Sequence, residues 1–191
     1  MRRRIPSALA ALAAVVALAG APPAEAEVAA DKQAIIILRI LAYDHALAHR
    51  AGAAVKLAVV HGESAAALAC AVRMRAALDG LVSRVVVTGK RIEVETLSAV
   101  DVSGHLLSQR GFAVLYLCTG ADAHVPAVVK AARAAQVLTF TDQVHYLARG
   151  MSIALSDDRA RVGISVNLVA ARAEGARLAA PFLRLSKVVA R

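Results

Sequence analysis

The sequence contains no tryptophan, and the three large aromatic residue types together make up only 3% of it. Hydrophobic residues nevertheless make up 59%, so the core has to be built mainly from alanine, valine and leucine. Stacking of bases on aromatic side chains is the usual basis of single-stranded nucleic-acid binding. The scarcity of aromatic residues therefore argues against a nucleic-acid partner. The net charge of +9 comes from basic residues spread along the chain singly and in pairs, which is typical of a solvated surface.

Cysteine is equally scarce, since Cys70 and Cys118 are the only two. In an oxidising compartment such a pair is a candidate disulfide. The alternative is a pair of reduced thiols that are buried as small apolar side chains. The sequence does not show whether the two Cα atoms come within disulfide range, so both interpretations stay open.

Motifs that carry catalysis are missing or incomplete. No Gly-x-Gly-x-x-Gly fingerprint is present, and Thr88-Gly89-Lys90 lacks the upstream glycine of a phosphate-binding loop. Ser152 lies in a partial nucleophile-elbow pattern, at the start of an expected strand instead of a strand-to-helix turn. His45 and His49 are four residues apart, but two ligands are too few for zinc. We expect no enzymatic activity, no metal and no cofactor.

One long uncharged apolar run is present, near the start of the chain. Arg2, Arg3 and Arg4 precede it, the run extends over residues 8–18, and Ala24-Glu25-Ala26 follows. This order is the pattern of a secretory signal peptide, and the run is well short of the roughly 20 residues that span a bilayer. We therefore expect residues 1–26 to be removed before Glu27 and residues 27–191 to work outside the cytoplasm as one domain. The alternatives are an uncleaved anchor and a lipid-modified variant, and no cysteine lies near the cleavage point to carry a lipid.

Short buried strands alternate with helical segments through the middle of the chain. Such alternation predicts parallel strands joined by crossover helices. The expected helices are residues 33–50, 64–78, 101–110, 122–135, 167–175 and 178–191, and the expected strands are 55–60, 85–88, 92–96, 112–117 and 137–140. Residues 151–155 and 160–166 alternate around a polar turn and predict an antiparallel hairpin. The predicted fold is a single-domain three-layer α/β/α sandwich with a mostly parallel, mixed sheet, and a C-terminal hairpin plus helix.

Small polar residues follow three of the expected strands. In open parallel sheets, ligands bind beyond the carboxyl ends of the strands, so these residues form a candidate ligand-binding rim. They are His61, Gly62, Glu63, Thr119, Gly120, Thr141 and Asp142. Ordinary turns require the same residue types, and that interpretation remains open as well.

The C-terminal half carries a series of segments in an order typical of one family. These are Val137–Asp142, Gly150–Ile153, Val162–Arg172 and Phe182–Val189, with Gly89-Lys90-Arg91 further upstream. The series resembles the "vLTVsD", "GGMI", "INL-AA" and "LL-LA-VV" segments of the YfiR-like family of periplasmic proteins. The resemblance covers roughly residues 31–191.

The chain departs from that family at several places. Leu41–His45 replaces the aromatic-rich opening, and Arg149 takes the place of the first glycine of the pair. Two cysteines cannot supply the two disulfides of the best-studied members, and no site residue is carried over from them.

The resemblance implies a non-catalytic repressor that holds a membrane-bound diguanylate cyclase inactive. Its partner would be the periplasmic domain of that cyclase or of another inner-membrane sensor, and a homodimer is left open. A periplasmic small-molecule-binding module without a cyclase partner is the alternative.

Overall fold

The computed structural model describes residues 29–158 and 161–190. The predicted signal peptide and its cleavage point lie outside the described residues. The described chain forms a seven-stranded sheet in the order β2-β1-β3-β4-β5-β6-β7. The strands are β1 (Val55–His61), β2 (Ile92–Ser98), β3 (Phe112–Leu117), β4 (Leu138–Thr141), β5 (Ile153–Asp158), β6 (Arg161–Asn167) and β7 (Lys187–Ala190).

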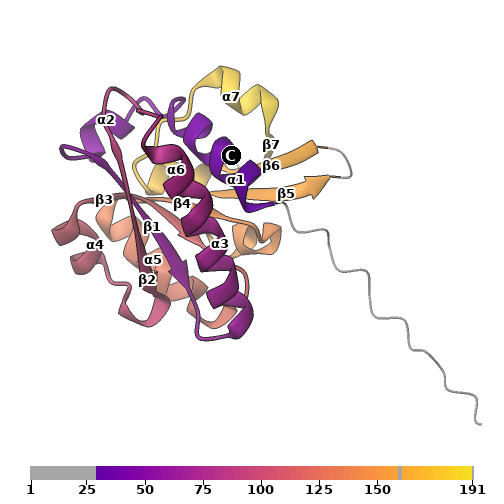
Figure 1. Cartoon of the computed structure of the whole chain (residues 1–191). Coiled ribbons are helices and arrows are strands. Elements are labelled where there is room, and N and C mark those ends of the chain that lie inside the picture. Colours follow the sequence, from indigo (N-terminus) through magenta and orange to yellow (C-terminus); the bar gives the residue numbers. More distant parts are fainter. Residues whose placement is uncertain (1–28, 159–160, 191) are drawn as a thin grey trace, which may run out of the picture.

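Helices cover both faces of this sheet (Figure 1). The α-helices are α1 (Ala30–Leu41), α2 (Leu47–Arg50), α3 (Ala65–Val82), α4 (Gly104–Arg110), α5 (Val125–Ala135), α6 (Leu168–Ala173) and α7 (Ala180–Leu185). Three short 3-10 helices are η1 (Ala99–Asp101), η2 (Asp122–His124) and η3 (Val144–Arg149). The predicted three-layer α/β/α architecture is confirmed.

The sheet is mostly parallel, as predicted. β1 pairs with both β2 and β3, β3 with β4, β4 with β5 and β6 with β7, all in parallel. β5 and β6 are antiparallel and form the predicted hairpin. Every residue of β3 is buried, which is the pattern of a central strand covered on both faces.

The core is divided by the sheet into two clusters. Side chains of α1, α3, α6 and α7 pack on one face, and those of α4, α5 and η3 on the other. Successive residues of β1 alternate between the faces, with Leu57 and Val59 in the first cluster and Ala58 and Val60 in the second. This is the two-residue period of a strand buried on both sides.

The predicted helix over residues 33–50 is wrong, because the chain turns at residues 42–46. Asp44 is buried within that turn, where its Oδ1 accepts hydrogen bonds from the Ala46 and Arg177 backbone N–H groups at 3.0 Å and 2.8 Å. A buried carboxylate needs donors of this kind, and a continuous helix would not provide them. The helix therefore divides into α1 and α2.

Two further predictions of local structure are wrong. Residues 85–88 form no strand beyond an isolated bridge between Val87 and Lys90, because Thr88 (φ 51°) and Gly89 (φ 75°) make a tight turn with positive φ. The helix predicted over residues 101–110 begins later, as α4, and is capped by Ser103, whose Oγ accepts the Leu106 N–H at 3.2 Å. Asp101, the first residue of the predicted helix over residues 101–110, belongs to η1.

The last predicted helix, over residues 178–191, is also wrong. α7 ends at Leu185, and Lys187–Ala190 form β7, which pairs with β6. Backbone pairing with β6 gives the β-branched Val188 and Val189 a strand conformation, which suits such side chains. Leu185, the last residue of α7, is 75% exposed.

Candidate functional site

The predicted rim does lie at one edge of the sheet, where β1, β3 and β4 end. His61 is half-buried at the end of β1, and its Nδ1 lies 2.9 Å from the Gly62 carbonyl oxygen. Glu63 and Gly120 are exposed, and Thr119 is half-buried. Proximity of these residues follows from parallel pairing of the three strands.

Between β1 and β3 the rim is closely packed. A Cβ atom added at Gly62 would lie 3.0 Å from the Gly120 carbonyl oxygen, and one at Gly120 would lie 2.7 Å from Ser64 Oγ. Ser64 caps α3 by accepting the Ala67 N–H at 3.1 Å. The two loops therefore meet backbone to backbone over the beginning of α3, and their glycines serve this contact. Ligand binding at the rim remains a prediction.

The β4 end of the rim leads into a buried polar cluster beneath α1 and α3. Thr141 alternates with Phe140 and therefore faces away from α1 and α3; it is fully buried, and its Oγ1 accepts the Gln143 N–H at 3.1 Å. The half-buried Asp142 lies with its Oδ2 4.0 Å from Cys70 Sγ. Deeper in, Tyr116 donates a 2.6 Å hydrogen bond from its hydroxyl to Gln33 Oε1.

Electrostatics in this cluster oppose ionisation. Burial, and next the negative charge of Asp142, raise the pKa of Tyr116 well above its ordinary value. A hydrogen bond with Cys70, and next burial, raise the pKa of the Cys118 thiol far above its usual range. Since the thiolate is the reactive form of cysteine, Cys118 is not an activated nucleophile.

Both cysteines are buried free thiols in this structure. The candidate disulfide between Cys70 and Cys118 stays a prediction. Mass measurement of the exported protein, with and without reductant, tests it: a bridged protein is lighter by two hydrogens. Two free thiols in the exported protein would contradict the bridge.

Ser152, considered above for nucleophilic catalysis, has a structural position. It is fully buried at the beginning of β5, where its Oγ donates to the Glu174 carboxylate and its N–H donates to Thr139 Oγ1 at 2.9 Å. Glu174 also accepts the Thr139 N–H at 2.9 Å. Burial raises the pKa of Glu174 to about 7 against the opposing effect of these donors. The group ties α6 to β4 and β5, out of reach of a substrate.

The structure also places the candidate metal ligands His45 and His49 and the candidate phosphate-binding residue Lys90. His45 lies in the turn after α1 and His49 in α2, so the two do not share one helix. Among the residues that the structure describes, no group of three or more metal-ligating side chains is placed to hold an ion. Lys90 donates from Nζ to the carbonyl oxygens of Ala48, Ala51 and Gly52 at 2.7–2.8 Å. It therefore fixes the end of α2 instead of meeting a phosphate.

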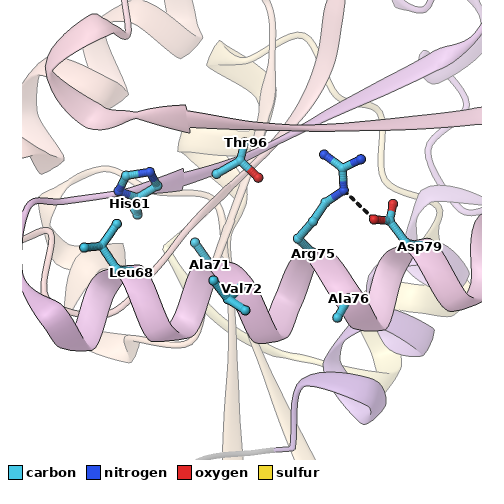
Figure 2. Close-up of a pocket in the computed structure, with 8 residues that line it drawn as sticks. All are labelled: His61, Leu68, Ala71, Val72, Arg75, Ala76, Asp79 and Thr96. Atoms are coloured by element: carbon cyan, nitrogen blue, oxygen red, sulfur yellow. Dashed lines mark hydrogen bonds and ion pairs between the residues drawn. The ribbon is translucent and has the colours of Figure 1, made fainter.

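A surface groove that the sequence did not indicate lies between α3 and the strands β1 and β2. It encloses about 300 Å³. His61 and Thr96 approach from the strands, while Leu68, Ala71, Val72 and Ala76 line the α3 side (Figure 2). Arg75 and Asp79 complete it and are joined by a 2.7 Å ion pair. Of the predicted rim residues, His61 is the one that lines this groove.

No helix among the described residues has the length and apolar character that crossing a membrane requires.

Several solved structures share the fold. A conserved domain protein from Vibrio cholerae O1 biovar El Tor matches with a TM-score of 0.59 and 14% identity, over 83% of this chain and 59% of that one. The ligand-free, open structure of CD0873, a substrate-binding protein with adhesive properties from Clostridium difficile, has a TM-score of 0.53 and 15% identity, over 76% of this chain and 57% of that one.

An ABC domain from Streptococcus pneumoniae, in complex with L-Trp, has a TM-score of 0.58 and 10% identity, over 84% of this chain and 60% of that one. The chain thus spans less than two thirds of each of these three proteins. Identities this low show a shared fold alone.

Sequence comparison gives a more specific result. The model of a family described as YfiR/HmsC-like matches residues 31–187. No curated protein matches the chain in sequence.

Proposed function

Because the chain belongs to the YfiR/HmsC-like family, we propose that it is an exported, non-catalytic regulator of a membrane-bound signalling protein. The match over residues 31–187 is the observation that carries the proposal. The partner that we infer is the periplasmic domain of an inner-membrane sensor. By the family resemblance, this sensor is a diguanylate cyclase that the bound regulator keeps inactive.

The physical requirement on such a regulator is differential affinity. A binding protein shifts a two-state partner only by preferring one state, and a shift from 1:99 to 99:1 takes a preference of about 10⁴-fold. No chemistry is needed, which agrees with the buried, carboxylate-bonded position of Ser152. The chain needs only a stable surface, which the doubly covered sheet supplies.

Gene deletion in the native host tests the proposal. We expect deletion to raise cellular cyclic di-GMP and surface attachment, and the full chain to restore both. Unchanged cyclic di-GMP and attachment after deletion would contradict the regulatory role.

A matched control separates the site of action from the activity. A chain that lacks residues 1–26 should accumulate in the cytoplasm and fail to restore repression, although its domain is intact. Full restoration by this truncated chain would contradict action in the periplasm.

Small-molecule binding is the second candidate, because two proteins with this fold are a substrate-binding protein and a domain solved with L-Trp. The groove of about 300 Å³ is at the lower end of the size of ligand pockets. A ligand that binds the native state raises its melting temperature, so a thermal-shift screen of metabolites should find stabilising compounds. A screen without any shift would contradict this candidate and leave the regulatory proposal standing.

A further inference from the structure

Charge is unevenly divided along the described chain. Residues 29–158 hold thirteen basic and eleven acidic residues, so they are close to neutral. Residues 168–190, which form α6, α7 and β7, hold four basic residues and a single acidic one. The acidic one is Glu174, which is fully buried and hydrogen-bonded to Thr139 and Ser152. This segment therefore presents basic side chains to the solvent and no carboxylate.

The basic side chains of this segment have no internal counter-charge. All four are exposed, namely Arg172, Arg177, Arg184 and Lys187. Within the described ranges, no carboxylate forms an ion pair with any of them. Earlier in the chain, by contrast, Arg75 pairs with Asp79 at 2.7 Å and Arg110 pairs with Glu95. The excess charge is thus local, and uncompensated cations of this kind raise the concentration of anions near them.

Apolar side chains lie among these cations on the outer side of α7. Leu185 is 75% exposed, the highest value of any large hydrophobic residue in the described chain. Pro181 is exposed four positions earlier, so the two lie on one side of the helix. Val189 on β7 is 46% exposed. Because Phe182 on the inner side is buried, α7 carries apolar residues on both its sides.

Contacts with the turn after α1 hold α7 in place. The Arg177 N–H donates to Asp44 Oδ1 at 2.8 Å, and the Ala179 N–H donates to the Tyr43 carbonyl oxygen at 2.9 Å. The Tyr43 ring stacks on Phe182, with 6.0 Å between the ring centroids. Helix α7 lies at the outer limit of the molecule, at the top in Figure 1. A flat external surface can therefore reach its outer side without any change of fold.

This combination distinguishes a lipid bilayer from an acidic protein. Anionic headgroups attract Lys and Arg side chains, each of which contributes about fivefold to the affinity close to the surface. A protruding leucine adds affinity where an apolar medium lies directly behind the charged layer, as the acyl region of a bilayer does. A purely acidic protein surface would satisfy Arg184 and Lys187 but would leave Leu185 in water.

We propose that the α7 surface, formed by Pro181, Arg184, Leu185, Lys187 and Val189, binds the anionic phospholipids of the inner membrane from the periplasmic side. Leu185 enters the boundary between headgroups and acyl chains, and Arg184 and Lys187 contact the phosphates. The proposal rests on the exported location proposed above, and not on the identity of the signalling partner. Membrane binding would hold the regulator where a membrane-bound partner lies and so raise its effective concentration.

Co-sedimentation of the purified exported chain with sucrose-loaded vesicles tests the proposal. We expect binding to vesicles of phosphatidylglycerol and phosphatidylcholine in equal parts, and none to pure phosphatidylcholine. Added salt should weaken the binding, because it screens the charges. Arg184→Gln combined with Lys187→Gln should lower the affinity for the anionic vesicles at least about tenfold.

Lys130→Gln is the matched control for Arg184→Gln alone. It removes the same charge from an exposed position of α5, which covers the other face of the sheet. We expect R184Q to lower the affinity about fivefold and K130Q to change it less than about twofold.

Leu185 gives an optical test, because the chain contains no tryptophan. Leu185→Trp introduces a single indole, whose emission should shift to the blue when anionic vesicles are added. Val100→Trp is its control, since Val100 is 58% exposed in η1, next to β2 at the opposite edge of the sheet. Its emission should not shift. Leu185→Gln should weaken vesicle binding, whereas Val100→Gln should not.

Three results would overturn the proposal. The first is a wild-type protein that stays in the supernatant with anionic vesicles at low salt. The second is vesicle binding that the double variant leaves intact, which would place the contact elsewhere on the chain. The third is binding that R184Q weakens and L185Q does not, which would favour an acidic protein partner over a bilayer.

Circular dichroism and melting of each variant show whether it is folded, and exposed positions such as Leu185 and Lys187 should tolerate the changes. Vesicle binding is measured on the purified chain. Its failure would therefore leave the cyclic di-GMP test of the regulatory role standing.

Discussion

Two carboxylates are buried in the described chain, Asp44 at 1% and Glu174 at 0% exposure, and their surroundings differ. Asp44 forms an ion pair with Arg50 and accepts two backbone N–H bonds. Glu174 is hydrogen-bonded to Thr139 and Ser152 and forms no ion pair with another described residue. Burial raises the pKa of Glu174 to about 7. Burial disfavours the charged form of a carboxyl unless a nearby cation compensates for it, so one site holds an ion pair and the other holds a proton near neutral pH.

Arg50→Met breaks the first half of this comparison and should have the largest effect. Besides Asp44, Arg50 donates to the Ala113 and Gln136 carbonyl oxygens at 3.0 Å and 2.9 Å. Removing one partner of a buried pair costs about 3–5 kcal/mol, so we expect a loss of this size in the free energy of unfolding. Urea unfolding followed by far-UV circular dichroism measures it.

Arg91→Met is the control for that measurement. Arg91 pairs with Glu93 at 2.8 Å, but its side chain is 74% exposed. Exposed pairs contribute roughly 0–1 kcal/mol, so R91M should change stability little. Equal losses in the two variants would mean that burial does not set the strength of the Asp44–Arg50 pair.

The pH dependence of stability tests the second half of the comparison, the protonated carboxyl group of Glu174. Because the pKa of Glu174 is raised from 4.5 to about 7 on folding, the native state holds a proton that the unfolded chain releases. The contribution of this proton on Glu174 to the free energy of unfolding is complete below about pH 4.5 and is lost as the pH rises through about 7. We expect wild-type stability to fall by about 1–3 kcal/mol between about pH 5 and 8.

Glu174→Gln should remove this component, because glutamine does not titrate. Melting curves and urea unfolding of both proteins at pH values across that range provide the comparison. A wild-type profile that E174Q reproduces in full would show that another group causes the dependence.

Tyr116→Phe probes the neutral hydrogen bond between Tyr116 and Gln33 and should have the smallest effect. It removes the 2.6 Å hydrogen bond to Gln33 and keeps the ring in place. A neutral buried hydrogen bond contributes about 1 kcal/mol, and urea unfolding should show a loss of this size. Tyr43→Phe, at a ring that is 38% exposed, should change nothing measurable. A larger loss in Y43F than in Y116F would contradict this ranking.

The sheet could be predicted from the sequence because its signal is local. The apolar runs of β1, β3 and β4 are bounded by glycine and polar residues. A strand that is buried on both faces requires such a nearly continuous apolar run. The hairpin of β5 and β6 could also be predicted from the sequence, because alternating apolar and polar residues lie on both sides of a polar turn.

The remaining features depend on partners that are distant in sequence. Asp44 breaks the first helix by bonding to Arg177, and Lys187–Ala190 become a strand by pairing with β6. The groove arises from α3 and β2 together, and neither segment marks it alone. One signal was available: α3 has apolar residues around most of its circumference, and it is the helix that borders the groove.

The close contact between the Gly62 and Gly120 loops limits the substitutions that these positions tolerate. In a saturation library, Glu63 should accept many substitutions because its side chain is exposed. Gly120 should accept almost none, since it has a φ of 74° and a Cβ there would collide with Ser64 Oγ. Survivors at Gly62 or Gly120 would be enriched for second changes at the other loop. Any effort to engineer a binding site at this end of the sheet would therefore have to redesign the two loops as a unit.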